Sequence, residues 1–72
     1  MVTRLGFAQG SKLGIFSIGS AADIANLPTM NTDGKGEADT YEPVCPGSYA
    51  LLNDGTGGKY ILKDTNEWVE EA

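Results

Sequence analysis

Residues 48–71 read SYALLNDGTGGKYILKDTNEWVEE, and this stretch decides the fold. It contains three short runs of aromatic and aliphatic residues, separated by the turn-forming sequences DGTGG and DTN. Runs of this length between Asp, Asn and Gly residues are typical of antiparallel strands joined by tight turns. We therefore predict a three-stranded meander with strands at residues 48–53, 59–63 and 67–71.

Side-chain alternation along these strands predicts a sheet with apolar groups on both faces. On one face we expect a cross-strand cluster of Tyr49, Leu51, Tyr60, Leu62 and Trp68. On the opposite face we expect Ala50, Leu52, Ile61 and Val69. Three strands alone cannot cover two apolar faces, so an N-terminal strand or a partner chain is expected to supply the missing layer.

The N-terminal segment alternates apolar side chains with glycines. Residues 12–18 predict a short strand that is also apolar on both faces, with Leu13 and Ile15 on one and Phe16 and Ile18 on the other. Residues 1–10 form either a further strand or an arm that lies on a neighbouring chain, because the sequence around Gly10 favours a turn.

Only residues 20–28 are typical of a helix. A serine suits the N-cap, Asp23 suits the first turn, and the alanines favour helix, while Pro28 ends the element within about two turns. Residues 29–47 are polar and rich in glycine. We predict a long polar loop there, with residues 31–39 exposed and mobile.

The chain has 72 residues, which is room for one domain spanning residues 1–72. We expect a mainly β protein: a small antiparallel β-sandwich or open barrel with a C-terminal three-stranded meander and at most one short helix. Cys45 is the only cysteine and histidine is absent, so neither an internal disulfide nor a zinc site of the usual kind can add stability. Oligomerisation or docking is the remaining way to stabilise so small a domain.

The charge and the apolar runs of the chain argue against two classes of partner. Its net charge is −5 and its pI about 4.3, which is the wrong sign for binding nucleic acid. No apolar run reaches the roughly 18 residues that cross a bilayer, and the N-terminus lacks the apolar core of a signal peptide. We expect a protein made in a cytoplasm with no membrane partner.

Enzymatic chemistry finds little support in the sequence. Without histidine, the usual nucleophilic triads cannot form, so we predict no enzymatic activity and no cofactor. The segment Asp33-Gly34-Lys35-Gly36 lacks the spacing of a phosphate-binding loop. Oxygen ligands for calcium could come from Asn31, Asp33, Glu37 and Asp39, but their spacing is not that of an EF-hand, and we predict no metal site. A carboxylate set for acid–base work could come from Asp54, Asp64 and Glu67, but these residues are also favoured in hairpin turns.

Aromatic residues leave two interpretations open. A platform for sugars or peptides could be formed by Tyr41, Tyr49, Tyr60 and Trp68. The other interpretation is a sheet core with interface anchors, because Trp and Tyr are frequent in both. We predict that the interface and core anchors are Phe7, Phe16, Tyr60, Leu62 and Trp68.

Four segments of the chain resemble a pattern of tailed-bacteriophage virion proteins, the small head-decoration and head-fibre proteins. The segments are Leu27-Pro28-Thr29, Pro46-Gly47-Ser48-Tyr49-Ala50-Leu51-Leu52, Lys59-Tyr60-Ile61-Leu62 and Asn66-Glu67-Trp68-Val69-Glu70. The resemblance covers residues 27–71. The chain departs from the pattern in the long turn at residues 54–58 and in the acidic stretch before Tyr41.

The resemblance implies a non-enzymatic part displayed on the surface of a capsid. Its expected partners are the major capsid protein and other copies of the chain, in trimers or another symmetric cluster. Related segments also occur in tail-fibre components, so the alternative is a fibre-tip or glycan-binding module.

Overall fold

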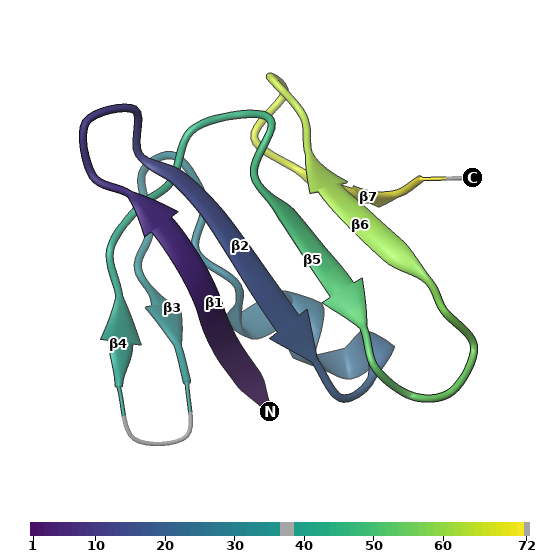
Figure 1. The fold of residues 1–72 in the computed structure, drawn as a ribbon. Coiled ribbons are helices and arrows are strands. Elements are labelled where there is room, and N and C mark those ends of the chain that lie inside the picture. Colours follow the sequence, from purple (N-terminus) through teal and green to yellow (C-terminus); the bar gives the residue numbers. More distant parts are fainter. Residues whose placement is uncertain (37–38, 72) are drawn as a thin grey trace.

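The computed structural model describes residues 1–36 and 39–71, which form a five-stranded sheet and a two-stranded sheet (Figure 1). The larger sheet has the strand order β1-β2-β5-β6-β7. Its pairings are antiparallel except that β2 runs parallel to β5. The prediction of a mainly β domain is confirmed, and the sheet is mixed rather than wholly antiparallel. The strand bounds are Val2–Ala8 for β1, Leu13–Ile18 for β2, Tyr49–Leu52 for β5, Lys59–Leu62 for β6 and Trp68–Glu70 for β7.

The N-terminal segment forms a hairpin within this sheet. β1 pairs with β2 from end to end, so residues 1–10 contribute a strand rather than a separate arm. The register shifts between Arg4 and Gly6, which leaves Leu5 as the extra residue of a β-bulge. A bulge distorts the ladder of an edge strand and makes β1 a poor template for pairing with a further chain.

The chain between β2 and β5 forms a second layer. Parallel strands cannot be joined by a tight turn, so this segment must cross a face of the sheet. It contains a short helix, η1 (Ala21–Asn26), and a small hairpin of β3 (Gly34–Lys35) and β4 (Thr40–Tyr41). In Figure 1 the helix lies behind the large sheet. We call residues 19–36 and 39–48 the crossover layer, and the side of the large sheet against it the covered face.

The crossover layer corrects two predictions. The second layer comes from the middle of the chain, whereas the N-terminal strand that was expected to supply it extends the same sheet. Residues 29–47 are not one long loop, because they contain the β3–β4 hairpin. Within the stretch predicted to be exposed and mobile, Gly34 is buried, and residues 37–38 lie outside the described residues.

The predicted helix is present, as a 3-10 helix over Ala21–Asn26. So short a helix depends on packing for its stability. Ile24 packs against the core, and Leu27 directly after the helix is buried. Over the two described ranges, no helix has the length and apolar character needed to cross a membrane.

The C-terminal meander is confirmed, and Tyr60, Leu62 and Trp68 share a face as predicted, but the two faces of the first strand are the reverse of the prediction. Ala50 pairs with Tyr60, and Leu62 pairs with Trp68, which places these four side chains together on the covered face. A shift of one residue in register moves every side chain of a strand to the other face. The face directed away from the crossover layer holds Tyr49, Leu51, Lys59, Ile61 and Val69.

The core lies between the covered face and the crossover layer. Phe16 is at its centre, with no exposed surface. Its ring centroid lies 5.7 Å from that of Tyr41 in β4 and 6.3 Å from that of Trp68, which it meets edge to face. The aromatic contacts therefore join β2 both to the crossover layer and to the last strand. The buried hydrophobic residues are Val2, Phe16, Ile18, Leu27, Tyr41, Val44, Ala50, Leu52 and Leu62.

Asp23 ties the start of η1 to the N-terminal hairpin. Its carboxylate accepts hydrogen bonds from the Met1 ammonium and from the backbone N–H groups of Gly19 and Ser20. The hydrogen bond from the ammonium is the largest cause that lowers the pKa of Asp23 from its ordinary value of 3.8, and the two N–H groups lower it further. The carboxylate is therefore more stable in the folded than in the unfolded chain.

The lowered pKa of Asp23 predicts a pH-dependent contribution to stability. A group with a depressed folded pKa stabilises the protein above its unfolded pKa, and this contribution is lost as pH falls through the folded pKa. We expect Asp23→Asn to lower Tm near neutral pH and to have a much smaller effect well below the ordinary carboxyl pKa of 3.8. Thermal melts of both proteins across this range would measure the difference. An equal difference in Tm at both ends of the range would contradict the prediction.

Candidate interaction surface

The side of the large sheet that faces away from the crossover layer has no second layer over it in residues 1–36 and 39–71; we call it the open face. The strand register places Ile15, Tyr49, Ile61 and Val69 in one row across four neighbouring strands. Sheets with one solvated face usually carry polar side chains on that face. The open face instead has an apolar row at its centre, which is the pattern of a surface that another layer covers.

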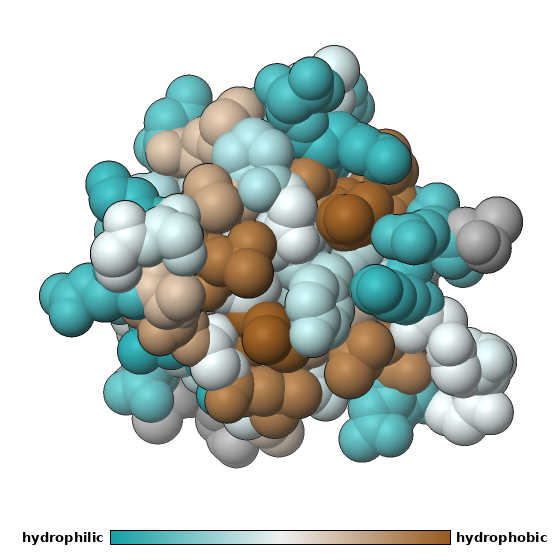
Figure 2. Space-filling model, turned by 45° about the horizontal axis from the view of Figure 1, so that its top comes forward, coloured by the Kyte–Doolittle hydropathy of each residue, from teal (hydrophilic) through white to brown (hydrophobic). Residues whose placement is uncertain are grey.

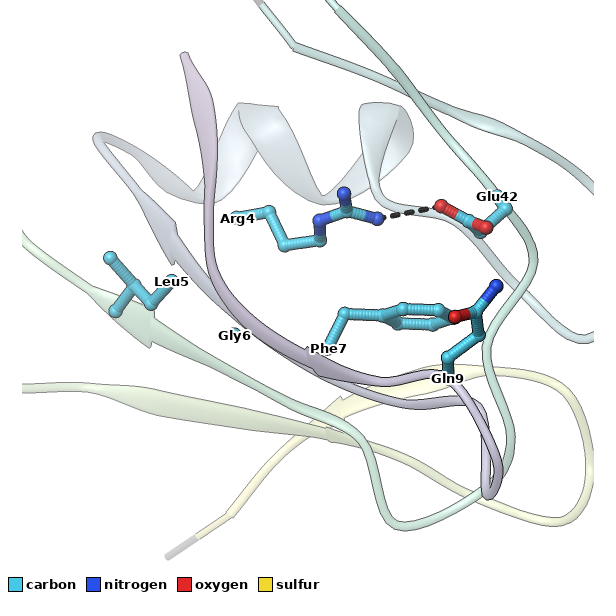
Figure 3. Close-up of a pocket in the computed structure, with 6 residues that line it drawn as sticks. All are labelled: Arg4, Leu5, Gly6, Phe7, Gln9 and Glu42. Carbon is cyan, nitrogen blue, oxygen red and sulfur yellow. Dashed lines mark hydrogen bonds and ion pairs between the residues drawn. The ribbon is translucent and has the colours of Figure 1, made fainter.

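Three aliphatic side chains of the open face are largely accessible to solvent. Leu5, Leu51 and Val69 are 57%, 41% and 37% exposed, whereas no hydrophobic residue of the core exceeds 8%. Leu5, at the bulge, points away from Arg4 and Phe7, which lie on the other side of β1 (Figure 3). Figure 2 shows apolar side chains gathered near the middle of one side of the molecule and hydrophilic side chains around them.

The charged residues of the open face stand at its β6–β7 end. The Lys59 ammonium lies 4.8 Å from the centroid of the Tyr49 ring. The backbone N–H of Glu71 donates to the Lys59 carbonyl, and that of Lys63 donates to the Glu67 carbonyl, so the β6–β7 register continues at both ends. Side-chain alternation places all four charged residues on the open side. Two lysines and two glutamates balance, so the open face has no net charge although the chain carries −5.

A hollow of about 430 Å³ lies beside β1. The Arg4 guanidinium donates to the Glu42 carboxylate at 2.8 Å and lies over the Phe7 and Tyr41 rings, at 5.0 and 5.3 Å from their centroids. The charge of Arg4 is therefore paired within the chain, and its flat face is used in packing. The hollow is lined by Arg4, Leu5, Gly6, Phe7, Gln9 and Glu42 (Figure 3). This set contains no hydroxyl, thiol or amine nucleophile.

The five anchors predicted from the sequence lie in the core or against it. Phe16 and Leu62 are buried, and Phe7, Tyr60 and Trp68 are partly buried and pack against the core. All five belong to the covered side, so their proposed contacts with another chain stay a prediction. Sequence reasoning missed the row on the open face, because the signal that identifies it is the strand register and not the residue types alone.

Trp68 closes the core beside β6. Its indole Nε1–H donates to the Pro28 carbonyl at 2.9 Å, and its ring packs on Phe16. Because the side chain is only partly buried, we expect Trp68→Ala to lower the free energy of unfolding by about 2–3 kcal/mol, below the range for a fully buried Trp. Urea unfolding followed by circular dichroism would measure the change.

A matched variant separates the packing of Trp68 from its hydrogen bond. Trp68→Phe keeps an aromatic ring and loses the indole N–H, so we expect it to cost about 1 kcal/mol from the lost hydrogen bond, plus a small packing term. Wild-type stability in Trp68→Ala would rule out this role for the side chain.

The loop considered for calcium makes different contacts. The side-chain amide of Asn66 donates to the Asn31 side-chain oxygen at 3.1 Å, and its own oxygen accepts the backbone N–H of Met30 at 2.8 Å. Asn66 thus ties the crossover layer to the β6–β7 turn, a role with no signal in the sequence. In the part of the chain that the structure describes, no three Cys, Asp or Glu side chains group as metal ligands. Glu37 lies outside that part.

The candidate carboxylates are parts of turns. Asp54 Oδ1 accepts hydrogen bonds from the Thr56 hydroxyl at 2.5 Å and from the Thr56 backbone N–H at 2.9 Å. The hydrogen bond from the Thr56 hydroxyl is the largest cause that lowers the pKa of Asp54 from its ordinary value, and the hydrogen bond from the Thr56 N–H lowers it further. A general acid near neutral pH needs a raised pKa, so Asp54 has the properties of a turn residue. Asp64 and Glu67 stand at the next turn, between β6 and β7.

The four aromatic residues considered as a ligand platform lie on both sides of the sheet. Tyr49 is on the open face, whereas Tyr60 and Trp68 are on the covered face. Tyr41, in the crossover layer, is only 8% exposed, and its hydroxyl lies 3.4 Å from the Val2 carbonyl oxygen. These residues do not form one platform.

Comparison with known proteins gives a uniform result. No family model, curated protein or solved structure matches the chain.

Proposed function

We propose that this protein is a non-enzymatic structural component of a bacteriophage particle, a small head-decoration subunit that assembles through its open face. The observation that carries the proposal is the apolar row of Ile15, Tyr49, Ile61 and Val69, which the rest of the described chain does not cover. In the particle, this row would be buried against other copies of the chain or against the shell.

The energetics of burial support an assembly role. Full burial of an aliphatic side chain contributes roughly 1.5–3 kcal/mol relative to full exposure. Leu5, Leu51 and Val69 retain between 37% and 57% of their exposure, so a partner that covers them recovers a large part of that contribution. A domain this small has a correspondingly small core, which makes the additional burial valuable.

The phage resemblance and the open face overlap in the chain. The segments that carry the resemblance include β5, β6 and β7. These strands supply Tyr49, Leu51, Ile61 and Val69, the larger part of the apolar row and its neighbour. The surface to be buried is therefore encoded mainly in the same segments that are similar to virion proteins.

A glycan-binding role has less support. A sugar platform requires an exposed aromatic ring with free polar groups beside it. The Trp68 N–H is already bonded to the Pro28 carbonyl, and Tyr41 is buried. The Lys59 ammonium lies over the Tyr49 ring, 4.8 Å from its centroid, and so occupies a ring face on which a sugar would stack. The fibre-tip alternative therefore has no aromatic site to match it in the described residues.

The composition of purified phage particles tests the proposal. Under this proposal the chain is a component of one phage, and particles of that phage would be purified by density gradient from cells that also make the chain. The amount of the chain would then be measured relative to the major capsid protein by mass spectrometry. We expect a fixed ratio of chain to capsid protein in every preparation. We also expect Val69→Lys, on the open face, to lower that ratio, and Met30→Lys, with a similar exposed fraction off that face, to leave it unchanged.

Two outcomes would overturn the proposal. Absence of the chain from particles made in cells that express it would exclude a virion role. A lowered ratio for Met30→Lys but not for Val69→Lys would place the attachment surface elsewhere on the molecule.

A further inference from the structure

We infer that the open face is covered by a second copy of this chain, with the two sheets packed face to face about a two-fold axis. This inference rests on the proposed function, because it treats the open face as the assembly surface, and it names the partner. Two properties of the face carry it, its charge and its self-complementary apolar pattern, and the area of the face sets the expected strength of the pair.

The charge of the open face favours an identical partner. The chain has a net charge of −5, yet the two lysines and two glutamates of the open face balance. The excess acidic charge therefore lies on other surfaces, where salt screens it over about 8 Å at physiological ionic strength. A basic partner would place its excess positive charge against the two lysines of the open face. An acidic partner would place its excess negative charge against the two glutamates. A neutral apolar surface, such as the open face itself, meets neither mismatch.

The pattern of the face is complementary to itself. A two-fold contact joins the same patch of both copies, so the patch must match its own image. The apolar row of Ile15, Tyr49, Ile61 and Val69 runs across the sheet, with one lysine and one glutamate on either side of its β6–β7 end. When two such rows meet, apolar residues face apolar residues, and the charged side chains lie toward the β6–β7 edge of each sheet. Two packed sheets whose strands cross at about 30° are a common arrangement for layers of this kind.

The area of the face predicts a weak pair. Five strands spaced about 4.8 Å apart, each roughly 17 Å long, give a face of roughly 400 Å². Two copies would then bury roughly 800 Å² in total, which is below the usual range for stable complexes. We therefore expect a dimer that dissociates on dilution and is favoured where copies are concentrated, as on the surface of a particle.

Sedimentation equilibrium over a wide concentration range tests the inference. We expect the mass to rise from that of one chain, 7.6 kDa, to twice that value, with no larger species. Leu51→Glu places a carboxylate on the open face opposite Lys59, where the folded monomer tolerates it. It should raise the dissociation constant of the dimer at least about tenfold, since the dimer would bury the new charge.

Met30→Glu is the matched control. Met30 is 39% exposed and Leu51 is 41% exposed, and Met30 lies in the crossover layer, away from the open face. We expect this variant to dimerise like the wild type, although it adds the same charge to the chain. Circular dichroism would check that both variants remain folded.

The outcomes separate this inference from the proposed function. A trimer, a monomer at every concentration, or equal weakening by both variants would overturn the two-fold pair. If the two-fold pair were overturned in this way but the chain were still present on particles at a fixed ratio, the structural role would stand, with the shell as the partner of the open face. A dimer that is absent from particles would overturn the structural role and leave the pair intact.

Discussion

Replacement of Phe16 by alanine is expected to lower the free energy of unfolding by about 3–5 kcal/mol. The side chain has no exposed surface, and its ring contacts Tyr41 in the crossover layer and Trp68 in β7. Its removal would leave a cavity at the point where the two layers and the last strand meet. Small domains have total stabilities near the low end of about 5–15 kcal/mol, so the variant should retain about 2 kcal/mol at most and be measurably unfolded at room temperature.

Ile15→Ala is the control for this prediction. Ile15 is the neighbour of Phe16 in β2, but its side chain lies on the open face and is only partly buried. Its truncation should cost clearly less than that of Phe16, because little cavity is formed. Urea unfolding of dilute protein, followed by circular dichroism, compares the two variants with the wild type. Equal costs would mean that the two faces of β2 are not as different as their burial indicates.

Gly34→Ala is expected to destabilise the protein by about 3 kcal/mol or more, toward the upper end of the effects of overpacking. A Cβ at residue 34 would lie 2.5 Å from the Pro28 backbone nitrogen and 2.8 Å from the Asn26 carbonyl oxygen. Both atoms belong to the backbone, so no side-chain rotation can make room. The whole β3–β4 hairpin would have to move away from the end of η1 and uncover part of the core.

The control for Gly34 is a glycine with space around it. A Cβ at Gly10 would meet no heavy atom within 4 Å. Gly10→Ala should therefore have little effect on Tm, whereas Gly34→Ala should lower Tm by more than 10 °C, given the roughly 4–8 °C per kcal/mol of a domain this size. Similar Tm values for the two variants would contradict the close packing of β3 on the segment before it.

Local sequence patterns predicted the elements that depend on short-range chemistry. The three strands of the meander and the helix start near Asp23 follow from turn residues, alternation and capping. The two faces of residues 12–18 were also predicted, and the structure buries Phe16 and Ile18 on the covered face. In each of these elements the signal lies within a few residues of the chain.

Long-range features could not be predicted in the same way. The parallel pairing of β2 with β5 brings together residues more than thirty positions apart in the chain, and nothing local to either strand specifies it. β3 and β4 have only two residues each, too few for an alternation pattern. The faces of the first meander strand could not be predicted because both carry apolar residues, so a slip of one residue across the turn at 54–58 has no clear cost in the pattern.

The open face illustrates what the sequence and the structure each contribute. Composition and alternation already indicated that the strands carry apolar groups on both sides. The structure identifies which side the chain covers by itself and which side it leaves open, with Leu51 and Val69 still accessible. Tyr60 and Trp68, predicted as possible interface anchors, lie on the covered side, so the proposed assembly surface is built from other residues.

Hydroxyl-radical footprinting of the dispersed and the assembled protein measures burial of the open face side chain by side chain. In the assembled protein we expect labelling of Leu51 and Val69 to fall severalfold, while labelling of Met30 stays at the level of the dispersed chain. If Leu51 and Val69 are labelled equally in both forms, the open face is not the surface through which this protein assembles.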